Sequence, residues 1–273
     1  MVSGAISIAQ ALEASGLDPR EARLLLAAAS GFSQAGVLAN PERALPDEVR
    51  ERFADWSARR RAGEPVAYLL GRREFYGLAL AVNPAVLIPR PETELLVEFA
   101  LERLAPGQAA RVLDLGTGSG AVALAIKQQR PHVTMVAVEA SAAALVVARR
   151  NAASLGLAVD LRHGIWFDPV RGERFDLIVS NPPYVAEDDA HLGEGDLRFE
   201  PRSALVAGAD GLQAIRAIAA EARAHLLPDG ILALEHGYDQ AGAVREVLAA
   251  GGLRDAATRR DLAGIERVTR AQA

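Results

Sequence analysis

The sequence predicts an α/β protein in which a seven-stranded, doubly wound (Rossmann-like) domain follows a small all-α domain and a β-hairpin linker. Three observations lead to this fold class. Residues 1–75 carry helix signals only, strands and helices alternate from residue 91 onwards, and a glycine-rich loop joins the first of those strands to the next helix. Such alternation is typical of a parallel sheet that is covered by helices on both faces.

Length and composition limit the classes of protein to which the chain could belong. Its 273 residues suffice for one large domain, or for a medium domain with a small companion. Thirty Lys and Arg residues against 35 Asp and Glu residues give a net charge of −5. A mildly acidic balance argues against binding of nucleic acid over many phosphates, so no sequence-specific nucleic acid binding is expected.

Cysteine and histidine usage bears on metal sites and on the compartment. The chain has no Cys, which excludes disulfides, thiolate nucleophiles and Cys-ligated metals. Its five His residues show no ligand spacing, so we expect no metal. The apolar runs are too short to span a membrane, and the N-terminus lacks the pattern of a secretory signal. We therefore expect a cytoplasmic protein without a membrane segment.

The first 75 residues are predicted to form short helices joined by turns. Residues 7–10 and 18–21 have the spacing of capping boxes, the second with Pro at the first helical position. Two further helix starts are predicted at 40–41 and 46–47, and the last helix ends in three arginines, as the helix dipole favours. This pattern alone leaves two interpretations open: a packed cap, or a surface that recognises a partner.

Residues 75–88 change to the alternation that is typical of strands. Gly77 and the pair 83–84 (Asn-Pro) are turn signals, so a β-hairpin is predicted here. We place it in a linker of residues 76–90, which leaves residues 91–273 for the α/β domain.

Strands and helices then follow one another in the α/β domain. Strands are predicted at 111–115, 133–138, near 159, at 175–180, at 231–235 and twice near the C-terminus, and helices at 92–104, from 121, at 141–155, from 211 and at 239–250. The helix at 141–155 is expected to begin at Ser141 and to end at Gly156, whereas Asp210 with Gln213 is expected to cap the helix that begins near Gly211.

A glycine loop follows the first strand of this domain. Glycines allow positive φ angles and close approach of a ligand to the backbone, and the next helix begins with free N–H groups. The candidate cofactor contacts are Gly116, Thr117, Gly118, Ser119 and Gly120. Nicotinamide, flavin and S-adenosylmethionine proteins all use such loops. Glu139 ends the next strand, about 20 residues further on, where the ribose hydroxyls of an adenosine-containing cofactor are usually held.

The tetrapeptide Asn181-Pro182-Pro183-Tyr184 follows the strand at 175–180. In a doubly wound sheet this strand neighbours the first one, so the tetrapeptide and the glycine loop should face one cleft. The prolines stiffen the turn and fix two acceptors, the side-chain oxygen of Asn181 and the carbonyl of Pro182. Two fixed acceptors suit a planar NH₂ group, on which the ring of Tyr184 could stack. The competing interpretation is a structural Pro-rich turn.

These motifs resemble those of the amino-methyltransferases that use S-adenosylmethionine. Further segments narrow the resemblance to the bacterial methyltransferases that modify the glutamine of the Gly-Gly-Gln motif in peptide chain release factors, and it covers nearly the whole chain from about residue 65. The segments are Tyr68-Leu69-Leu70-Gly71, Phe75-Tyr76-Gly77, 86–94 (Val-Leu-Ile-Pro-Arg-Pro-Glu-Thr-Glu), Glu200-Pro201 and 208–212 (Gly-Ala-Asp-Gly-Leu).

The resemblance implies an enzyme, a cofactor and a protein substrate. It implies that the loop at 116–120 and Glu139 hold S-adenosylmethionine, with Trp166 beside the adenine. It implies that Asn181 and the carbonyl of Pro182 bind the glutamine amide, with Asn181 also near the methyl donor, and that the N-terminal helices recognise the release factor. Residues 185–209, a long segment of weak periodicity, are expected to close over the glutamine.

Three positions depart from the family pattern. Ile165 stands where the family usually has Asp, which puts in doubt a polar contact from that side chain to the adenine amine. Glu139 replaces a more usual Asp but keeps the carboxylate, and His236 occupies a position that is commonly apolar.

Three other functions compete with this one. A DNA amino-methyltransferase acting on adenine N6 or cytosine N4 would use the same tetrapeptide, but it needs a target-reading domain and a basic groove. A nicotinamide oxidoreductase would need a hydride-transfer partner, and none is evident. A helical binding module on an inactive sheet domain would not need an intact loop and tetrapeptide.

Overall fold

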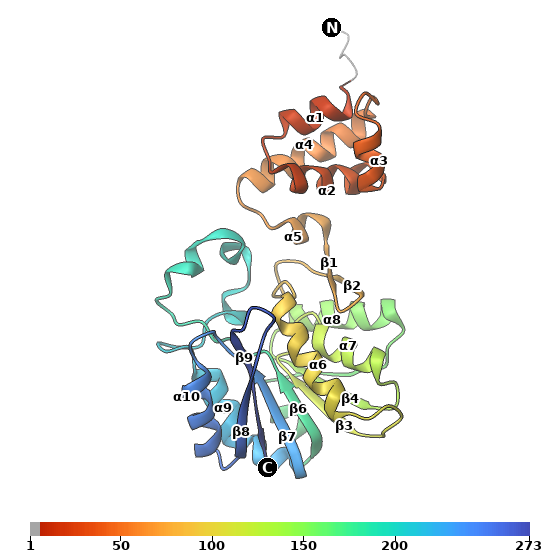
Figure 1. The fold of residues 1–273 in the computed structure, drawn as a ribbon. Helices are drawn as coiled ribbons and strands as arrows, with labels where there is room; N and C mark the ends of the chain where they lie inside the picture. The colour runs from red at the N-terminus through yellow and green to blue at the C-terminus, as the bar shows by residue number, and fades with distance from the viewer. Residues whose placement is uncertain (1–5) are drawn as a thin grey trace. The chain divides into compact units, whose positions relative to one another are not determined.

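The computed structural model describes residues 6–273, which form two compact units (Figure 1). The helical unit contains the residues up to Gly71 together with Gly193–Phe199, and the sheet unit contains Arg72–Leu192 and Glu200–Ala273. Each unit has its own buried hydrophobic core.

The helical unit is built from five helices and a short 3-10 segment. The helices are α1 (Ile8–Ala14), α2 (Pro19–Ser30), α3 (Gln34–Ala39), α4 (Asp47–Arg61) and α5 (Val66–Leu70), and the 3-10 segment is η4 (Gly195–Phe199). The predicted capping box at Ser7 is confirmed, because the Gln10 amide N–H donates to Ser7 Oγ and the Ser7 N–H donates to Gln10 Oε1. Leu25 and Leu26 of α2 pack with Phe53 of α4 in the core.

The helix start predicted at 40–41 is wrong. Helix α3 instead begins after Ser33, whose hydroxyl accepts the N–H of Gly36, and it ends at Ala39. Asn40 follows with a non-helical φ of −129°, and its side chain donates back to the Gly36 carbonyl. The residue before a proline disfavours the α conformation, so the Asn-Pro pair ends a helix here.

A β-hairpin opens the sheet unit, but it lies earlier than predicted. Strands β1 (Arg72–Phe75) and β2 (Leu78–Ala81) pair antiparallel, whereas 75–88 was the expected range. Tyr76 and Gly77 both have positive φ angles, 49° and 77°, as a two-residue type I′ turn requires. The turn signal at Gly77 was therefore correct, but it marks the middle of the hairpin, so one strand must precede it.

The main sheet has seven strands in the order β5-β4-β3-β6-β7-β9-β8. They are β3 (Arg111–Leu115), β4 (Thr134–Glu139), β5 (Asp160–His163), β6 (Phe175–Ser180), β7 (Leu226–Glu235), β8 (Arg254–Arg260) and β9 (Glu266–Gln272). The first five strands in this order pair in parallel, and β9 and β8 pair antiparallel at one edge. The predicted seven-stranded α/β fold is confirmed, as is the pairing of the two strands that carry the loop and the tetrapeptide.

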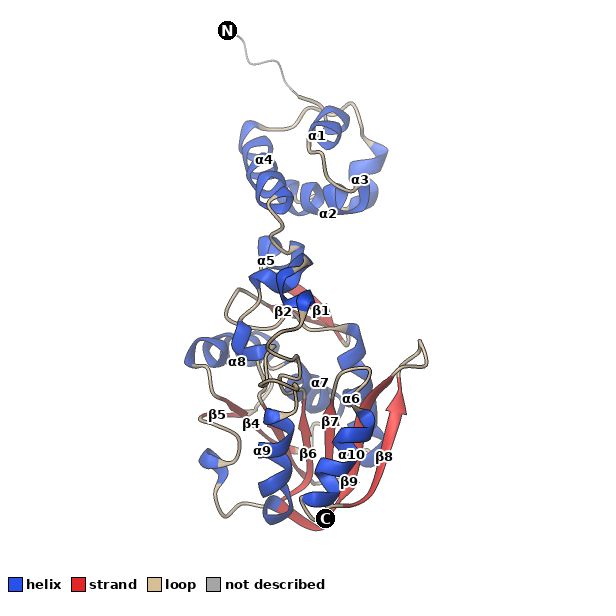
Figure 2. Cartoon of the chain, turned by 90° about the vertical axis from the view of Figure 1, so that its left-hand side faces the viewer, coloured by secondary structure: helices blue, strands red, loops and turns tan. Residues whose placement is uncertain are grey.

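Helices cover both faces of this sheet (Figures 1 and 2). The helices are α6 (Glu94–Arg103), α7 (Ala121–Gln129), α8 (Ala142–Leu155), α9 (Gln213–Ala222) and α10 (Ala241–Ala250), and short 3-10 turns lie at Pro91–Thr93, Asp168–Val170, Ala190–Gly193, Arg202–Ala204 and Arg223–His225. Alternate strand residues serve different cores: Val112 packs with the residues of α6 and α7, and Leu113 packs with those of α9 and α10. This division is what a sheet buried on both faces requires.

Two local predictions about this unit have different outcomes. Gly156 ends α8 in the left-handed conformation, as predicted, and Ser141, the predicted first residue, is the N-cap, which accepts the N–H of Ala144. Helix α9 begins after Leu212, however, and Asp210 is not its N-cap. The carboxylate of Asp210 instead accepts the Leu212 N–H, one residue before the helix, and binds Arg216.

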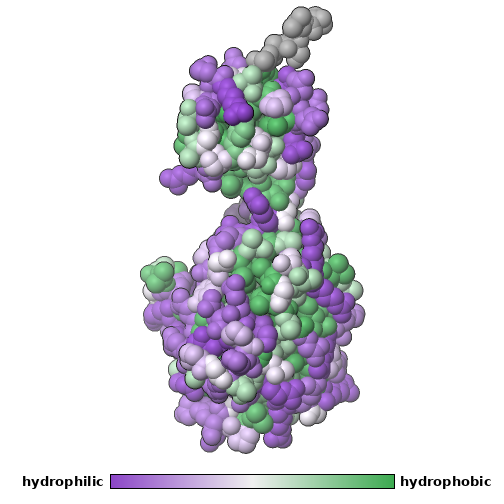
Figure 3. Space-filling model, turned by 90° about the vertical axis from the view of Figure 1, so that its right-hand side faces the viewer, coloured by the Kyte–Doolittle hydropathy of each residue, from purple (hydrophilic) through white to green (hydrophobic). Residues whose placement is uncertain are grey.

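Within residues 6–273, no helix combines the length and the apolar character that a membrane crossing requires. The face in Figure 3 shows hydrophilic and hydrophobic residues interspersed on both units.

Candidate active site

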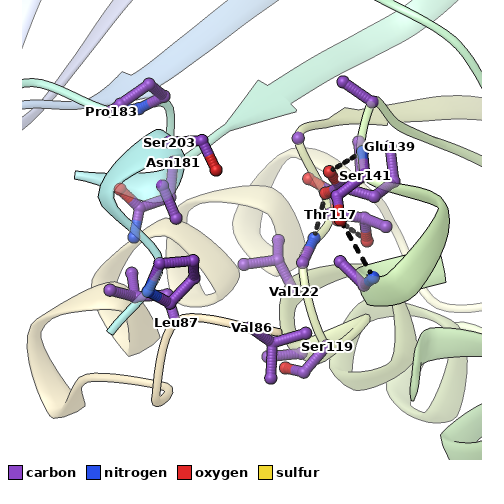
Figure 4. A pocket seen from close by; sticks show the side chains of 18 of the residues that line it. Val86, Leu87, Thr117, Ser119, Val122, Glu139, Ser141, Asn181, Pro183 and Ser203 are labelled. Carbon is purple, nitrogen blue, oxygen red and sulfur yellow. Dashed lines mark hydrogen bonds between the residues drawn. The ribbon is translucent and has the colours of Figure 1, made fainter. Parts of the chain in front are cut away.

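A cavity of about 450 Å³ opens in the sheet unit at the carboxyl ends of β3, β4 and β6. Its wall combines the glycine loop after β3, the end of β4, the tetrapeptide after β6 and the segment 85–93 before α6. In Figure 4, Asn181 and Pro183 lie on one side of the cavity, and Thr117 and Glu139 lie on the other. The topology thus brings the two predicted motifs to one site.

The glycine loop has the backbone that was predicted for it. Gly116 and Gly118 have φ angles of 70° and 57°, a region that L side chains rarely adopt. The N–H groups of Gly116 and Thr117 donate to the Val138 carbonyl and tie the loop to β4. Residues Gly116 to Ser119 line the cavity, whereas Gly120 caps α7 with a left-handed backbone.

Glu139 is held rigidly at the end of β4. One carboxylate oxygen accepts the N–H of Gly118 and the other accepts the N–H of Ser141, both at 2.8 Å. A carboxylate offers about four acceptor positions, so both oxygens keep capacity for hydroxyl donors. This is the geometry that the predicted ribose contact needs.

Asp114 is a cavity residue to which the sequence analysis gave no role. Its carboxylate accepts the Thr117 hydroxyl at 2.6 Å, and burial raises its pKa to about 7. The available signal was its position at the end of the first strand, directly before the glycine loop. Asp114, a residue of β3, thus fixes the side chain of the loop residue Thr117.

Asn181 lines the cavity, and a hydrogen bond fixes the orientation of its side-chain amide. Its Nδ2 donates to the Thr93 hydroxyl oxygen at 3.0 Å, and no donor to Oδ1 is found among residues 6–273. The amide oxygen is therefore available as an acceptor. Pro183 also lines the cavity, while Pro182 is buried beside it.

Tyr184 is not on the cavity wall, where the stacking prediction needs it. Its hydroxyl donates to Glu235 Oε1 at 3.3 Å, and its carbonyl accepts the side-chain N–H of Gln240 at 2.9 Å. Burial and the neighbouring Glu235 carboxylate raise the pKa of Tyr184 well above its usual value. In this structure Tyr184 anchors the tetrapeptide to β7.

Trp166 and Ile165 form another part of the wall. Trp166 has a φ of 43°, and a Cβ on Gly116 would lie 3.6 Å from its ring, so ring and loop are in close approach. Ile165 is 59% exposed and adds an apolar side chain. Both side chains thus line the same cavity as the glycine loop and Glu139.

Sequence reasoning missed several other wall residues. Thr93, Ser203 and Ala204 line the cavity, and Arg90 binds the buried Glu200 at 2.6 Å. Arg90, Thr93 and Glu200 belong to segments that were quoted for the family resemblance, and Ser203 and Ala204 lie in the segment 185–209, so signals were present without an assigned role for these residues. Among residues 6–273 no group of three or more His, Cys, Asp or Glu residues could hold a metal ion.

Comparison with known proteins first defines the class. A family model described as "Methyltransferase small domain" matches residues 91–195. The fold is similar to that of a methyltransferase from Pyrococcus furiosus, with a TM-score of 0.55 at 20% identity over 81% of this chain and 98% of that one. The fold is thus that of a methyltransferase.

The family follows from closer relatives. A second family model, "PrmC N-terminal domain", matches residues 6–71. The chain is 54% identical to the release factor glutamine methyltransferase of Pseudomonas aeruginosa over 92% of this chain and 91% of that protein. It is 51% identical to the protein of that name from Burkholderia pseudomallei over 96% and 94%, respectively. The chain belongs to the release factor glutamine methyltransferases.

Proposed function

We propose that the protein transfers a methyl group from S-adenosylmethionine to the side-chain amide nitrogen, N5, of the glutamine in the Gly-Gly-Gln motif of peptide chain release factors. The observation that carries this proposal is the Asn181 amide in the cavity wall, which is anchored through Nδ2 and keeps Oδ1 without a donor among residues 6–273, with a glycine loop on the other side of the cavity. We propose that this reaction takes place in the cytoplasm.

The cavity fits the proposed cofactor. Its volume of about 450 Å³ lies within the range of small-molecule sites. Glu139 would accept the ribose hydroxyls, the loop from Gly116 to Ser119 would line the ribose and methionine parts, and Trp166 would lie beside the adenine. When bound, the cofactor supplies an electrophilic methyl on a positively charged sulfur with a good leaving group.

The tetrapeptide would hold the substrate amide. Asn181 Oδ1 and the Pro182 carbonyl would accept one amide hydrogen each, which fixes the NH₂ plane and directs the nitrogen towards the methyl group. The nitrogen forms its bond to carbon as the carbon–sulfur bond breaks, and it then loses a proton. Positioning accounts for most of the acceleration, because no covalent intermediate with the protein is needed.

The helical unit would supply recognition of the release factor. Its match to the N-terminal domain of the family supports this role. We keep residues 1–75 as the substrate-recognition domain, 76–90 as the linker and 91–273 as the methyltransferase domain.

A transfer assay tests the proposed function directly. The protein is incubated with a labelled methyl donor and either intact release factor, a release factor with Gln→Ala in the Gly-Gly-Gln motif, or DNA. We expect label only on the intact release factor. Label on DNA would instead support the amino-methyltransferase of adenine or cytosine.

Replacing Glu139 by Ala should weaken cofactor binding by on the order of 10- to 100-fold. The variant loses two charge-assisted hydrogen bonds, one from the loop N–H of Gly118 and one from the N–H of Ser141, as well as the proposed ribose contacts. Calorimetric titration with S-adenosylmethionine measures the effect. Glu246→Gln, which removes one exposed negative charge on α10, is the matched control and should bind like the wild type. Equal affinity of the Glu139 variant and the wild type would contradict the ribose role.

The segment 185–209 should become protected when substrate binds. Val185 and Val206 are bridged, and Ser203 and Ala204 already line the cavity, so the segment is anchored at both ends beside the glutamine site. Hydrogen exchange in the presence of cofactor and release factor measures closure as slower exchange of its amides. Unchanged exchange throughout 185–209, with protection elsewhere, would contradict the lid.

A further inference from the structure

A second polar cluster lies next to Asn181, on the side away from the acceptor Oδ1. Thr93 Oγ1 accepts the Asn181 side-chain N–H at 3.0 Å, and Glu235 Oε1 accepts the Tyr184 hydroxyl at 3.3 Å. The Thr93 hydroxyl also lies close enough to the Glu235 carboxylate to lower the pKa of Glu235. The cluster of Thr93, Tyr184 and Glu235 thus joins three segments, from the 3-10 turn before α6, the tetrapeptide and β7.

Glu235, the last residue of β7, is an unusual residue to be fully buried. It is 1% exposed, and its Oε2 atom has no hydrogen-bond partner within residues 6–273. A carboxylate in such surroundings carries a large desolvation cost. An apolar side chain could pack at this position without that cost, so the carboxylate calls for a function of its own.

The direction of the hydrogen bonds in this cluster is constrained. The Thr93 oxygen accepts from Asn181, and the Thr93 hydroxyl lowers the pKa of the nearby Glu235 carboxylate, as a donor to that carboxylate does. An ionised Glu235 only accepts, so it draws the Thr93 hydrogen towards itself. The lone pairs of Thr93 then face Asn181, which must present its NH₂ group to Thr93 and its oxygen to the cavity.

We propose that Thr93 and Glu235 are positioning residues, which set the direction of the Asn181 carboxamide through a hydrogen-bond chain from Asn181 Nδ2 through the Thr93 hydroxyl to the Glu235 carboxylate. This inference rests on the proposed function and deepens it. An amide oxygen and an amide NH₂ group differ little in shape, so packing alone does not fix which of the two Asn181 presents to the substrate. Without a polar partner of fixed direction, the Asn181 amide turns over, and its NH₂ group faces the NH₂ group of the substrate.

The direction of this hydrogen-bond chain depends on whether Glu235 is protonated. Burial raises the pKa of Glu235 to about 7, and the Glu92 carboxylate adds to the rise, whereas Thr93, Tyr184 and the Arg267 guanidinium on β9 oppose it. Arg90 acts on the same cluster by opposing the rise in the pKa of Tyr184. A protonated Glu235 can donate to Thr93, which then offers its hydrogen to Asn181 and favours the reversed amide. Activity should therefore rise as the pH increases through about 7.

Substitutions at Thr93 test the hydrogen-bond chain from Asn181 to Glu235. Thr93→Val keeps the shape but removes both donor and acceptor, and Thr93→Ser keeps the hydroxyl. We expect kcat for release factor to fall on the order of 10- to 100-fold in the valine variant, with the cofactor Kd within about twofold of wild type and kcat of the serine variant within about threefold. Wild-type kcat in Thr93→Val, in a variant with a wild-type melting temperature, would overturn the proposal.

The pH profile separates positioning from packing. Glu235→Gln is nearly isosteric and cannot ionise, so the acidic limb of kcat near pH 7 should disappear at saturating cofactor and release factor. Asp114 has a similarly raised pKa, so Asp114→Asn is the matched variant and should keep the limb. A limb that persists in Glu235→Gln and disappears in Asp114→Asn would overturn the role of Glu235. Wild-type protein that fails to methylate release factor would instead refute the proposed function, so the two failures are distinguishable.

Discussion

Replacing Asn181 by Ala is expected to reduce kcat on release factor by on the order of 10²- to 10³-fold or more, close to complete loss of turnover. The variant removes the side-chain acceptor on the cavity side and the anchor to Thr93 on the other side. The loop and Glu139, which would hold the cofactor, are on the opposite wall and keep their contacts. The cofactor Kd should therefore stay within about twofold of wild type.

The comparison of kcat with cofactor affinity is what makes this experiment specific. Single-turnover methylation at saturating cofactor gives the chemical step, and calorimetry gives the cofactor Kd. Asn181→Asp is the informative companion, because it keeps the acceptor oxygens but loses the NH₂ group that Thr93 holds. We expect a large loss there as well. Methylation by Asn181→Ala at a near wild-type rate would exclude the proposed mechanism.

Much of the fold could be predicted because its signals are local. Strands β3 and β6 begin and end at the predicted residues, since each is a run of buried apolar residues closed by a glycine loop or a proline pair. The errors occurred where one signal has two structural meanings. An Asn-Pro pair can begin or end a helix, and an Asp before an apolar run can cap a helix or, as Asp210 does, bind an arginine.

The site could be predicted in part for the same reason. The glycine loop, Glu139 and Asn181 each act at the end of one strand, and the strand order then brings them to one cavity. The Thr93 contact could not be foreseen, because it joins Asn181 to a residue 88 positions away in a turn that approaches only in the folded chain. The orientation of Tyr184 towards Glu235, 51 positions away, depends on tertiary structure in the same way.

Replacing Gly211 by Ala should both destabilise the sheet unit and impair catalysis. Gly211 has a φ of 71°, and a Cβ at this position would lie 2.3 Å from the Tyr184 carbonyl oxygen and 2.8 Å from Gln240 Nε2. Backbone of the tetrapeptide must move to make room. The positive φ and the overlap together should cost about 2–4 kcal/mol of the free energy of unfolding.

The control for this substitution separates backbone strain from the clash. Gly156 has a similar φ of 66° at the end of α8, with nothing within 4 Å of an added Cβ. Gly156→Ala should therefore cost only about 1 kcal/mol in urea unfolding and leave kcat unchanged. Gly211→Ala should in addition lower kcat. The hydrogen bond from Gln240 to the Tyr184 carbonyl is lost, and the displaced backbone of Tyr184 moves Asn181 through the stiff Pro-Pro turn. If both variants had the same stability and the same kcat, the clash with Tyr184 would have no consequence, and the tetrapeptide would not need the fixed position that the mechanism gives it.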